Sequence, residues 1–205
     1  MNNEIYSNNV SSADNQQERL IKLGWIIGFV DGEGCFSIGF IKQSEKKEQN
    51  RIRKGYKLGY QVFHEFAVTQ GAKSLDSLQE LKSFFGIGNI YINRRHDNHK
   101  EPLYRYVVRK REDLINIIIP FFQNNPLRTS KNSDFIKFSE CLKMVNHGQH
   151  LEENGIIEIA TIAGTMNRQK PRLSLIKILR DQTPNTSKGE DMVRTLWRQR
   201  EAKVV

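Results

Sequence analysis

Hydrophobic and polar positions along the chain follow a pattern that predicts a mixed α+β domain. Residues 17–32 carry apolar side chains around most of the helix circumference, which is typical of a buried helix. The stretches 35–42 and 56–69 then alternate between apolar and polar positions, as half-buried strands do. Residues 72–85 return to a spacing of three and four, which predicts an amphipathic helix that ends at Gly86.

The same order of patterns repeats further along the chain. Residues 88–95 and 103–109 predict two more strands, 112–123 and 129–145 predict helices, and 152–166 and 173–179 are weaker helical patterns. One antiparallel sheet with helices on one face is the simplest arrangement of these elements. We expect a disordered or extended lead over 1–16, a core domain over 17–150, C-terminal helices packing on the core over 151–182, and a basic tail with a short helix over 183–205.

Three glycines interrupt the first helix at a spacing of four residues, at Gly24, Gly28 and Gly32. That spacing places them on one face of the helix. Each glycine inside a helix costs about 0.5–1 kcal/mol relative to alanine. A stripe of them therefore suggests that another backbone approaches closely, although Gly24 and Gly32 also fit the alternative of simple end signals.

Charge adds a class of partner to this picture. The 205 residues carry a net charge of +9, and no apolar run is long enough to cross a membrane. Much of the excess lies in the connection 42–57, which holds seven Lys or Arg residues and two Glu residues. Such a distribution favours a polyanion, most simply a nucleic acid, and the alternative is a basic protein with a solvated loop.

The strand face opposite the predicted core is polar. Amides, Tyr and Arg read base edges in the major groove, which admits strands, whereas a solvated face is the alternative interpretation. With the basic connection, the positions that we expect to contact DNA are Ser37, Gln43, Arg51, Arg53, Lys54, Gln61, Glu65, Asn89, Tyr91, Asn93, Arg95 and Arg105.

Two carboxylates, Asp31 and Glu33, flank Gly32 where the first helix ends. The C-terminal end of a helix is partly negative, so acidic residues there need compensation. Oxygen ligands of this kind suit Mg²⁺, which takes one or two carboxylates and keeps waters for a phosphate substrate. The alternative is a turn in which both carboxylates face water.

The residues at this helix end resemble a known family. The run from Ile26 to Gly34, Ile-Ile-Gly-Phe-Val-Asp-Gly-Glu-Gly, resembles the LAGLIDADG motif of homing endonucleases. Four further segments, 66–70, 86–90, 120–122 and 126–131, resemble later parts of the same family in the same order. The resemblance covers about residues 20–145 and is specific because several motifs agree.

The resemblance implies the αββαββα LAGLIDADG homing-endonuclease fold, an antiparallel sheet saddle with helices on one face. In such proteins two motif helices pack together at a two-fold or pseudo-two-fold interface. The chain has one copy of the motif, which implies a homodimer with Gly24, Gly28 and Asp31 at the interface. The DNA target would be long and pseudo-palindromic.

The resemblance also assigns roles to residues. Glu33 stands at the metal-binding acid of the family, and the Gly32 carbonyl is a further candidate ligand for Mg²⁺, with Mn²⁺ or Ca²⁺ able to substitute in binding. Gln70 matches a residue that positions catalytic water. Lys131 matches a basic residue near the scissile phosphate, with Arg128 as a rival.

These roles imply an intron-encoded, site-specific double-strand DNA endonuclease that hydrolyses phosphodiester bonds. The alternatives are an RNA maturase that acts on its own intron RNA and a non-cleaving, sequence-specific DNA-binding protein of the same fold. No targeting signal is recognised, and residues with AT-rich codons are abundant, so we expect synthesis inside an organelle, either chloroplast or mitochondrion.

Overall fold

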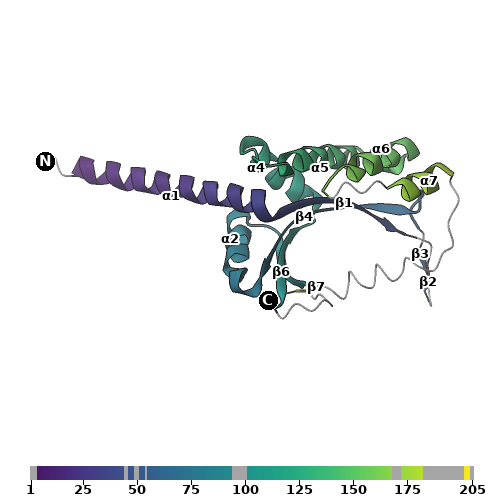
Figure 1. The fold of residues 1–205 in the computed structure, drawn as a ribbon, viewed down its shortest axis with the longest axis horizontal. Coiled ribbons are helices and arrows are strands. Elements are labelled where there is room, and N and C mark those ends of the chain that lie inside the picture. The colour runs from purple at the N-terminus through teal and green to yellow at the C-terminus, as the bar shows by residue number, and fades with distance from the viewer. Residues whose placement is uncertain are drawn as a thin grey trace.

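The motif helix runs straight into the first strand. The computed structural model describes residues 4–43, 46–48, 51–53, 55–93, 101–167, 172–181 and 201–203, and in it α1 (Glu4–Glu33) is followed without a loop by β1 (Gly34–Lys42). Because residues 4–16 are helical, the expectation of a disordered or extended lead is wrong for them. Figure 1 shows the N-terminal part of α1 projecting away from the body of the protein.

Only one stripe of α1 is covered within the chain. Ile26 and Val30, one turn apart, are fully buried, whereas Leu20 and Ile21 are 61% and 65% exposed. The prediction that this helix is buried all round is therefore wrong for the single chain. Both exposed apolar residues lie on the N-terminal side of Ile26 along α1.

The sheet confirms the α+β prediction. Its order is β1-β4-β6-β5-β7, with β4 at Tyr60–Gly71, β5 at Asn89–Asn93, β6 at Leu103–Val108 and β7 at Glu201–Lys203. All paired strands are antiparallel, and the β1–β4 register begins with Gly34 opposite Val68. The short helix expected in the basic tail lies in 182–200, outside the described residues.

The basic connection between the first two predicted strands contains two short strands. We expected a long polar loop there, but β2 (Lys46–Glu48) and β3 (Arg51–Arg53) pair as a two-stranded antiparallel sheet. The intervening charges did not predict this pairing, because Lys and Glu have low strand propensity. Figure 1 places this small sheet beyond the end of β1, away from the main sheet.

Helices cover one face of the curved main sheet (Figure 1). They are η1 (Ala72–Ser74), α2 (Leu75–Phe85), α3 (Arg111–Asp113), η2 (Leu114–Ile118), α4 (Ile119–Asn124), α5 (Lys131–Asn146), η3 (Gln149–Leu151), α6 (Glu153–Gly164) and α7 (Leu173–Asp181). The helix predicted over 112–123 contains a π-helical turn, η2, just before Pro120. Proline has no N–H to donate, which explains why the regular helical ladder is broken there.

Aromatic rings join the sheet to its helices. Phe36 of β1 is fully buried, and its ring lies 5.1–5.7 Å from those of Phe66, Phe122, Phe135 and Phe138. These rings come from β4, α4 and α5, so one cluster fixes the helices relative to the motif strand. Aromatic pairs at this spacing stabilise a core beyond the area that they bury.

The segment after α5 packs on the same core. Ile156, Ile159 and Ala160 of α6 are fully buried, and Leu179 of α7 is 5% exposed. Helices α6 and α7 therefore extend the helical layer beyond residue 150. Among the described helices, none is both long and apolar enough to span a membrane.

Strand β1 lies at an edge of the sheet, and side chains cap the carbonyls along that edge. Lys131 donates to the carbonyl of Gly34 at 2.5 Å, Asn167 to that of Phe36 at 2.9 Å, and Arg172 to that of Ile38 at 2.9 Å. The three carbonyls alternate along the strand and point away from β4. Capping them removes a template for pairing with another strand, which is how proteins protect exposed edges.

Candidate functional site

The carboxylate of Asp31 ties the end of α1 to the loop before α5. It accepts hydrogen bonds from the backbone N–H of Arg128 at 2.9 Å and of Thr129 at 3.1 Å, and from the Thr129 hydroxyl at 2.7 Å. Burial alone would raise the pKa of Asp31, but the bonds from Thr129 and Arg128 and the charge of Lys131 hold it below its ordinary value. Asp31 is therefore ionised and committed to this loop.

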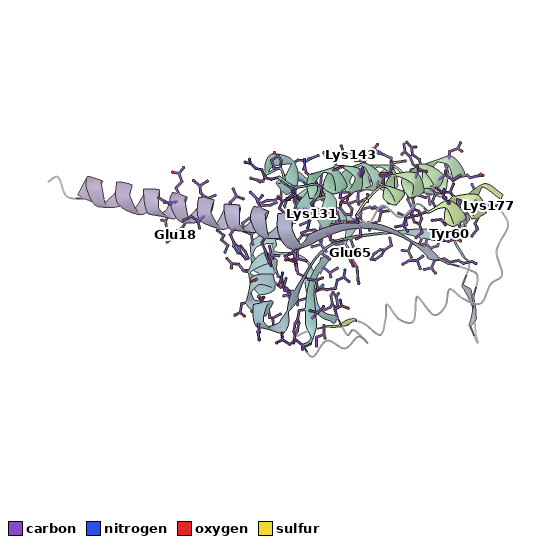
Figure 2. The ribbon with its side chains drawn as sticks, viewed as in Figure 1. Glu18, Tyr60, Glu65, Lys131, Lys143 and Lys177 are labelled. Carbon is purple, nitrogen blue, oxygen red and sulfur yellow. The ribbon has the colours of Figure 1, made fainter. Side chains whose placement is uncertain are left out.

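Lys131 is brought by that loop to the helix–strand junction. Its Nζ donates to the Gly32 carbonyl at 3.0 Å and to the Gly34 carbonyl at 2.5 Å. Figure 2 shows Lys131 beside the point where α1 meets β1. A cation at the C-terminal end of a helix satisfies orphan carbonyls and offsets the partial negative charge there.

Glu33 lies one residue further, at the last position of α1, and its side chain is exposed. An exposed carboxylate on the side of a helix end suits a hard divalent cation that keeps part of its water shell. The Gly32 carbonyl, the second predicted ligand, already accepts a bond from Lys131. A metal ion at that carbonyl would share it with the ammonium group or displace it.

A metal ion would also need ligands from beyond one copy of the chain. In the described part of the sequence, no three His, Cys, Asp or Glu side chains cluster closely enough to hold an ion. Glu33 supplies one carboxylate, and Asp31 uses both oxygens on the loop. Water, a phosphate or a second copy of the chain would have to complete the shell.

Gln70 lies near the same junction by strand register. Val68 pairs with Gly34, so Gln70 follows on β4 beside the residues that end α1. Its side chain is partly buried, and its pairing partner on β6 is Tyr104. The structure thus brings Glu33, Gln70 and Lys131 to one end of the sheet from three different elements.

The predicted DNA-contacting residues on β1, β4, β5 and β6 share the sheet face that the helices leave open. Ser37 on β1 pairs with Glu65 on β4, and Tyr91 on β5 pairs with Arg105 on β6, so these strands present one continuous surface. The side chains of Gln43 and Gln61 are joined by a hydrogen bond of 3.2 Å. Also on this face, partly buried, are Asn89 and Asn93.

One predicted contact residue does not face solvent. Glu65 was expected to contact DNA directly, but its side chain is only 3% exposed and is paired with Arg105 at 2.5 Å and Arg109 at 2.7 Å. The two guanidinium groups cover it. Of the other predicted contacts, Lys54 and Arg95 lie outside the described residues. At Arg51 and Arg53 the structure describes the backbone of β3 alone.

The glycine stripe of α1 faces open space. A Cβ atom placed on Gly24, Gly28 or Gly32 would meet no described atom within 4 Å. Among the described residues, no contact therefore requires a glycine at these positions. The stripe is available for a close approach from outside the described chain.

Several residues of the site were missed from the sequence. Thr129 anchors Asp31, Asn167 and Arg172 cap β1, and Arg109 shares Glu65 with Arg105. The Thr-Ser pair at the start of the helix predicted over 129–145 is the one local signal for the first of these. Asn167 and Arg172 are more than 130 residues from the carbonyls that they cap, and no local pattern indicates such pairs.

Solved structures share this architecture. The homing endonuclease I-TnaI is 35% identical, with a TM-score of 0.60 over 78% of this chain and 96% of that one. The LAGLIDADG homing endonuclease I-SmaMI bound to cleaved DNA is 29% identical, with a TM-score of 0.62 over 80% of this chain and 49% of that one. The strand saddle and its helices are therefore a known fold.

Curated relatives are longer than this chain. A probable intron-encoded endonuclease 3 of Neurospora crassa is 33% identical over 68% of this chain. An uncharacterised 50.9 kDa protein in ND4 intron 1 of Podospora anserina is 34% identical over 62% of it. The chain spans about a quarter of the length of these two relatives. The profile described as LAGLIDADG endonuclease matches residues 26–142, more than half of the sequence, and the chain therefore belongs to this family.

Proposed function

We propose that the chain is a site-specific double-strand DNA endonuclease that hydrolyses phosphodiester bonds in a long pseudo-palindromic target. The observation that carries the proposal is the grouping of an exposed Glu33 with Lys131 at one end of an open polar sheet face. An acid and a cation at the end of a strand platform are what metal-assisted phosphodiester cleavage requires.

Each residue has a stated task in this proposal. Glu33 would hold a divalent cation, Mg²⁺ in the cell with Mn²⁺ or Ca²⁺ able to bind in its place. When bound, such an ion polarises a phosphoryl oxygen and lowers the pKa of a coordinated water. Lys131 would stabilise the negative charge that develops on the scissile phosphate, and Gln70 would orient the attacking water. Asp31 holds the loop that carries Lys131 rather than the metal.

The active unit in this proposal is a homodimer joined through α1. The open glycine face supports it, since glycines that meet no neighbour among the described residues allow a second helix backbone to approach. The exposed Leu20 and Ile21 on the same helix support it too. Each copy would then supply one Glu33 and one saddle, and two copies would cover two DNA half-sites.

We further propose an intron within an organellar genome as the origin of the gene. The names of the relatives support this, because one is a protein in ND4 intron 1 and others are named as intron-encoded endonucleases. A role in splicing its own intron RNA is the main alternative function.

Cleavage of a DNA duplex that spans the intronless insertion site tests the proposal. The wild-type chain should produce a double-strand break with Mg²⁺ and none with excess EDTA. Glu33→Gln should abolish cleavage but retain binding in Ca²⁺, whereas Glu18→Gln, on the exposed stem of the same helix, should cut normally. Tight binding by the wild type without any break would instead favour the non-cleaving DNA-binding protein. Splicing of the intron RNA without DNA cleavage would favour the maturase.

A further inference from the structure

A buried carboxylate lies at the centre of the open sheet face. Glu65 is on β4, on the side of the sheet away from α5 (Figure 2), yet its side chain is only 3% exposed. A carboxylate removed from water requires close compensation, because desolvating an unpaired charge is costly. Here two arginines supply it from β6 and the residue that follows β6.

The two arginines approach Glu65 differently. Arg105 donates through Nη2 to Oε1 at 2.5 Å and is itself only 14% exposed. Arg109 directs both Nε and Nη2 to Oε2, each at 2.7 Å, and its side chain is 36% exposed. Arg105 therefore covers the carboxylate, whereas Arg109 is held by it and still reaches the surface.

Aromatic rings hold Arg109 in place as well. Its guanidinium carbon lies 5.4 Å from the centre of the Phe63 ring and 5.8 Å from that of the Tyr91 ring. Cation–π contacts at these distances stabilise a guanidinium group while leaving its edges able to donate. Because an ion pair and two rings fix the group, little side-chain entropy remains to be lost when it binds.

We propose that Arg109 reads a guanine of the DNA target, and that Glu65 is the positioning residue that orients it. A guanidinium group presents several N–H donors in a rigid fork, and its bidentate contact with O6 and N7 of guanine is the commonest specific contact in the major groove. Arg109 turns its Nε and Nη2 toward Glu65, and its side chain is 36% exposed. This inference rests on the DNA recognition proposed above.

The register indicates where that guanine lies in the half-site. The printed β4–β6 pairing ends with Phe66 opposite Val108, so one further step would put Arg109 opposite Glu65. Glu65 is three residues along β4 from Val68, which pairs with Gly34 at the end of the motif helix. At about 3.4 Å per residue this separation is about 10 Å, which corresponds to roughly three base-pair steps. The guanine should therefore lie within the inner part of each half-site.

Selection from a randomised DNA duplex library tests the inference. The full chain, in a buffer with Ca²⁺, would be compared with Glu65→Gln, Arg109→Lys and the control Glu101→Gln, an acid whose ion pair with Lys73 is exposed. We expect the wild type and Glu101→Gln to enrich guanine at one inner position. Arg109→Lys keeps the charge but loses the fork, so the preference should fall roughly fivefold or more. Glu65→Gln should weaken the same position and no other.

The outcomes separate the two proposals. If the wild type enriches a target but both variants keep its preference at every position, the positioning role is wrong and Glu65 only braces the sheet. If Arg109→Lys or Arg109→Ala lowers affinity equally for all sequences and lowers the salt dependence, Arg109 contacts a phosphate instead. If the wild type enriches no sequence, the proposed sequence-specific recognition itself fails, and this inference fails with it.

Discussion

The ammonium group of Lys131 donates to the carbonyl oxygen of Gly32 at 3.0 Å, across 99 residues of sequence. This contact and a second one to the Gly34 carbonyl hold the positive charge of Lys131 at the end of the motif helix in the protein without DNA. Arg128, the rival for the basic role, instead gives its backbone N–H to Asp31. The geometry therefore supports Lys131 for the basic role at the proposed metal site.

Replacing Lys131 with alanine should reduce DNA cleavage by about 100-fold or more, because a positioned donor to developing charge contributes that much. Binding in Ca²⁺ should change by only a few-fold. Lys137→Ala is the matched control, since Lys137 also donates to a carbonyl, that of Thr165 at 3.1 Å, but away from the junction. Single-turnover cleavage with each variant measures the difference. Near-normal cutting by Lys131→Ala together with a large loss in Arg128→Ala would assign the role to Arg128.

Replacing Asp31 with asparagine should destabilise the chain by about 1 kcal/mol, because one carboxylate oxygen that accepts from the loop becomes an amide donor. The N–H groups of Arg128 and Thr129 would lose part of their partner, so the loop should loosen and Lys131 should shift. Urea unfolding gives the stability, and the cleavage rate gives the position of Lys131.

Asp76→Asn is the matched control for Asp31→Asn, because Asp76 is exposed in the first turn of α2. Cleavage by Asp31→Asn should fall although Glu33 and Lys131 are both present. Equal cleavage by Asp31→Asn and wild type, at equal protein concentration, would show that Asp31 does not position Lys131.

Replacing Asn167 with aspartate should destabilise the protein. Asn167 has a positive φ of 52°, its Nδ2 donates to the Phe36 carbonyl, and its backbone N–H donates to Asp134. Asp can adopt the same backbone conformation, but it replaces the donor by an oxygen that faces a carbonyl and adds charge near Asp134. We expect a loss of about 1–2 kcal/mol in the free energy of unfolding and a greater tendency to aggregate, since the edge of β1 loses a cap.

Asn116→Asp is the matched control for this change, because Asn116 is exposed on η2. Its stability should stay within about 0.5 kcal/mol of the wild type, as is usual for surface substitutions. Equal unfolding midpoints for the two variants would show that the cap on Phe36 contributes nothing measurable.

The elements of the core were predictable because each has a local cause. Strict alternation at Phe36 and Ile38 requires one buried face, and both residues are buried. Gly86 ends α2 in the left-handed conformation that was expected of it. Patterns of this kind depend only on neighbours in the sequence.

The parts that escaped prediction depend on distant partners. In the sequence, Glu65 has the pattern of a solvent-exposed polar residue on a strand. It is buried because Arg105 of β6 and Arg109, the residue after β6, pair with its carboxylate. Two of the three caps on β1, Asn167 and Arg172, come from residues beyond the segment 26–142 that matches the family. The role of the N-terminal part of α1 could not be predicted either, because that role depends on what packs against its exposed face.

His64 should make the stability of the protein depend on pH. The Nδ1 atom of His64 is buried and has no hydrogen-bond partner among the described residues. Burial first, and then the charges of Arg111 and His150, lower the pKa of His64 to about 4. The imidazole is therefore neutral in the folded protein at pH 7.

The direction of the effect follows from the lowered pKa. An unfolded chain protonates His64 near its ordinary value of 6.5, whereas the folded chain resists protonation until about pH 4. Stability is thus complete above pH 6.5 and falls as the pH drops toward 4, by up to about 3 kcal/mol from this group. Thermal unfolding at a series of pH values between 7.5 and 4.5 measures the loss.

His64→Phe should flatten this dependence while folding normally at pH 7.5, because an apolar ring replaces a buried nitrogen that has no partner. Part of the slope should remain, since burial and Arg111 also lower the pKa of His150. His147→Gln is the control for the loss of a histidine, because His147 is exposed just after α5. A profile for His64→Phe that coincides with the wild type throughout would show that the buried imidazole does not titrate with unfolding.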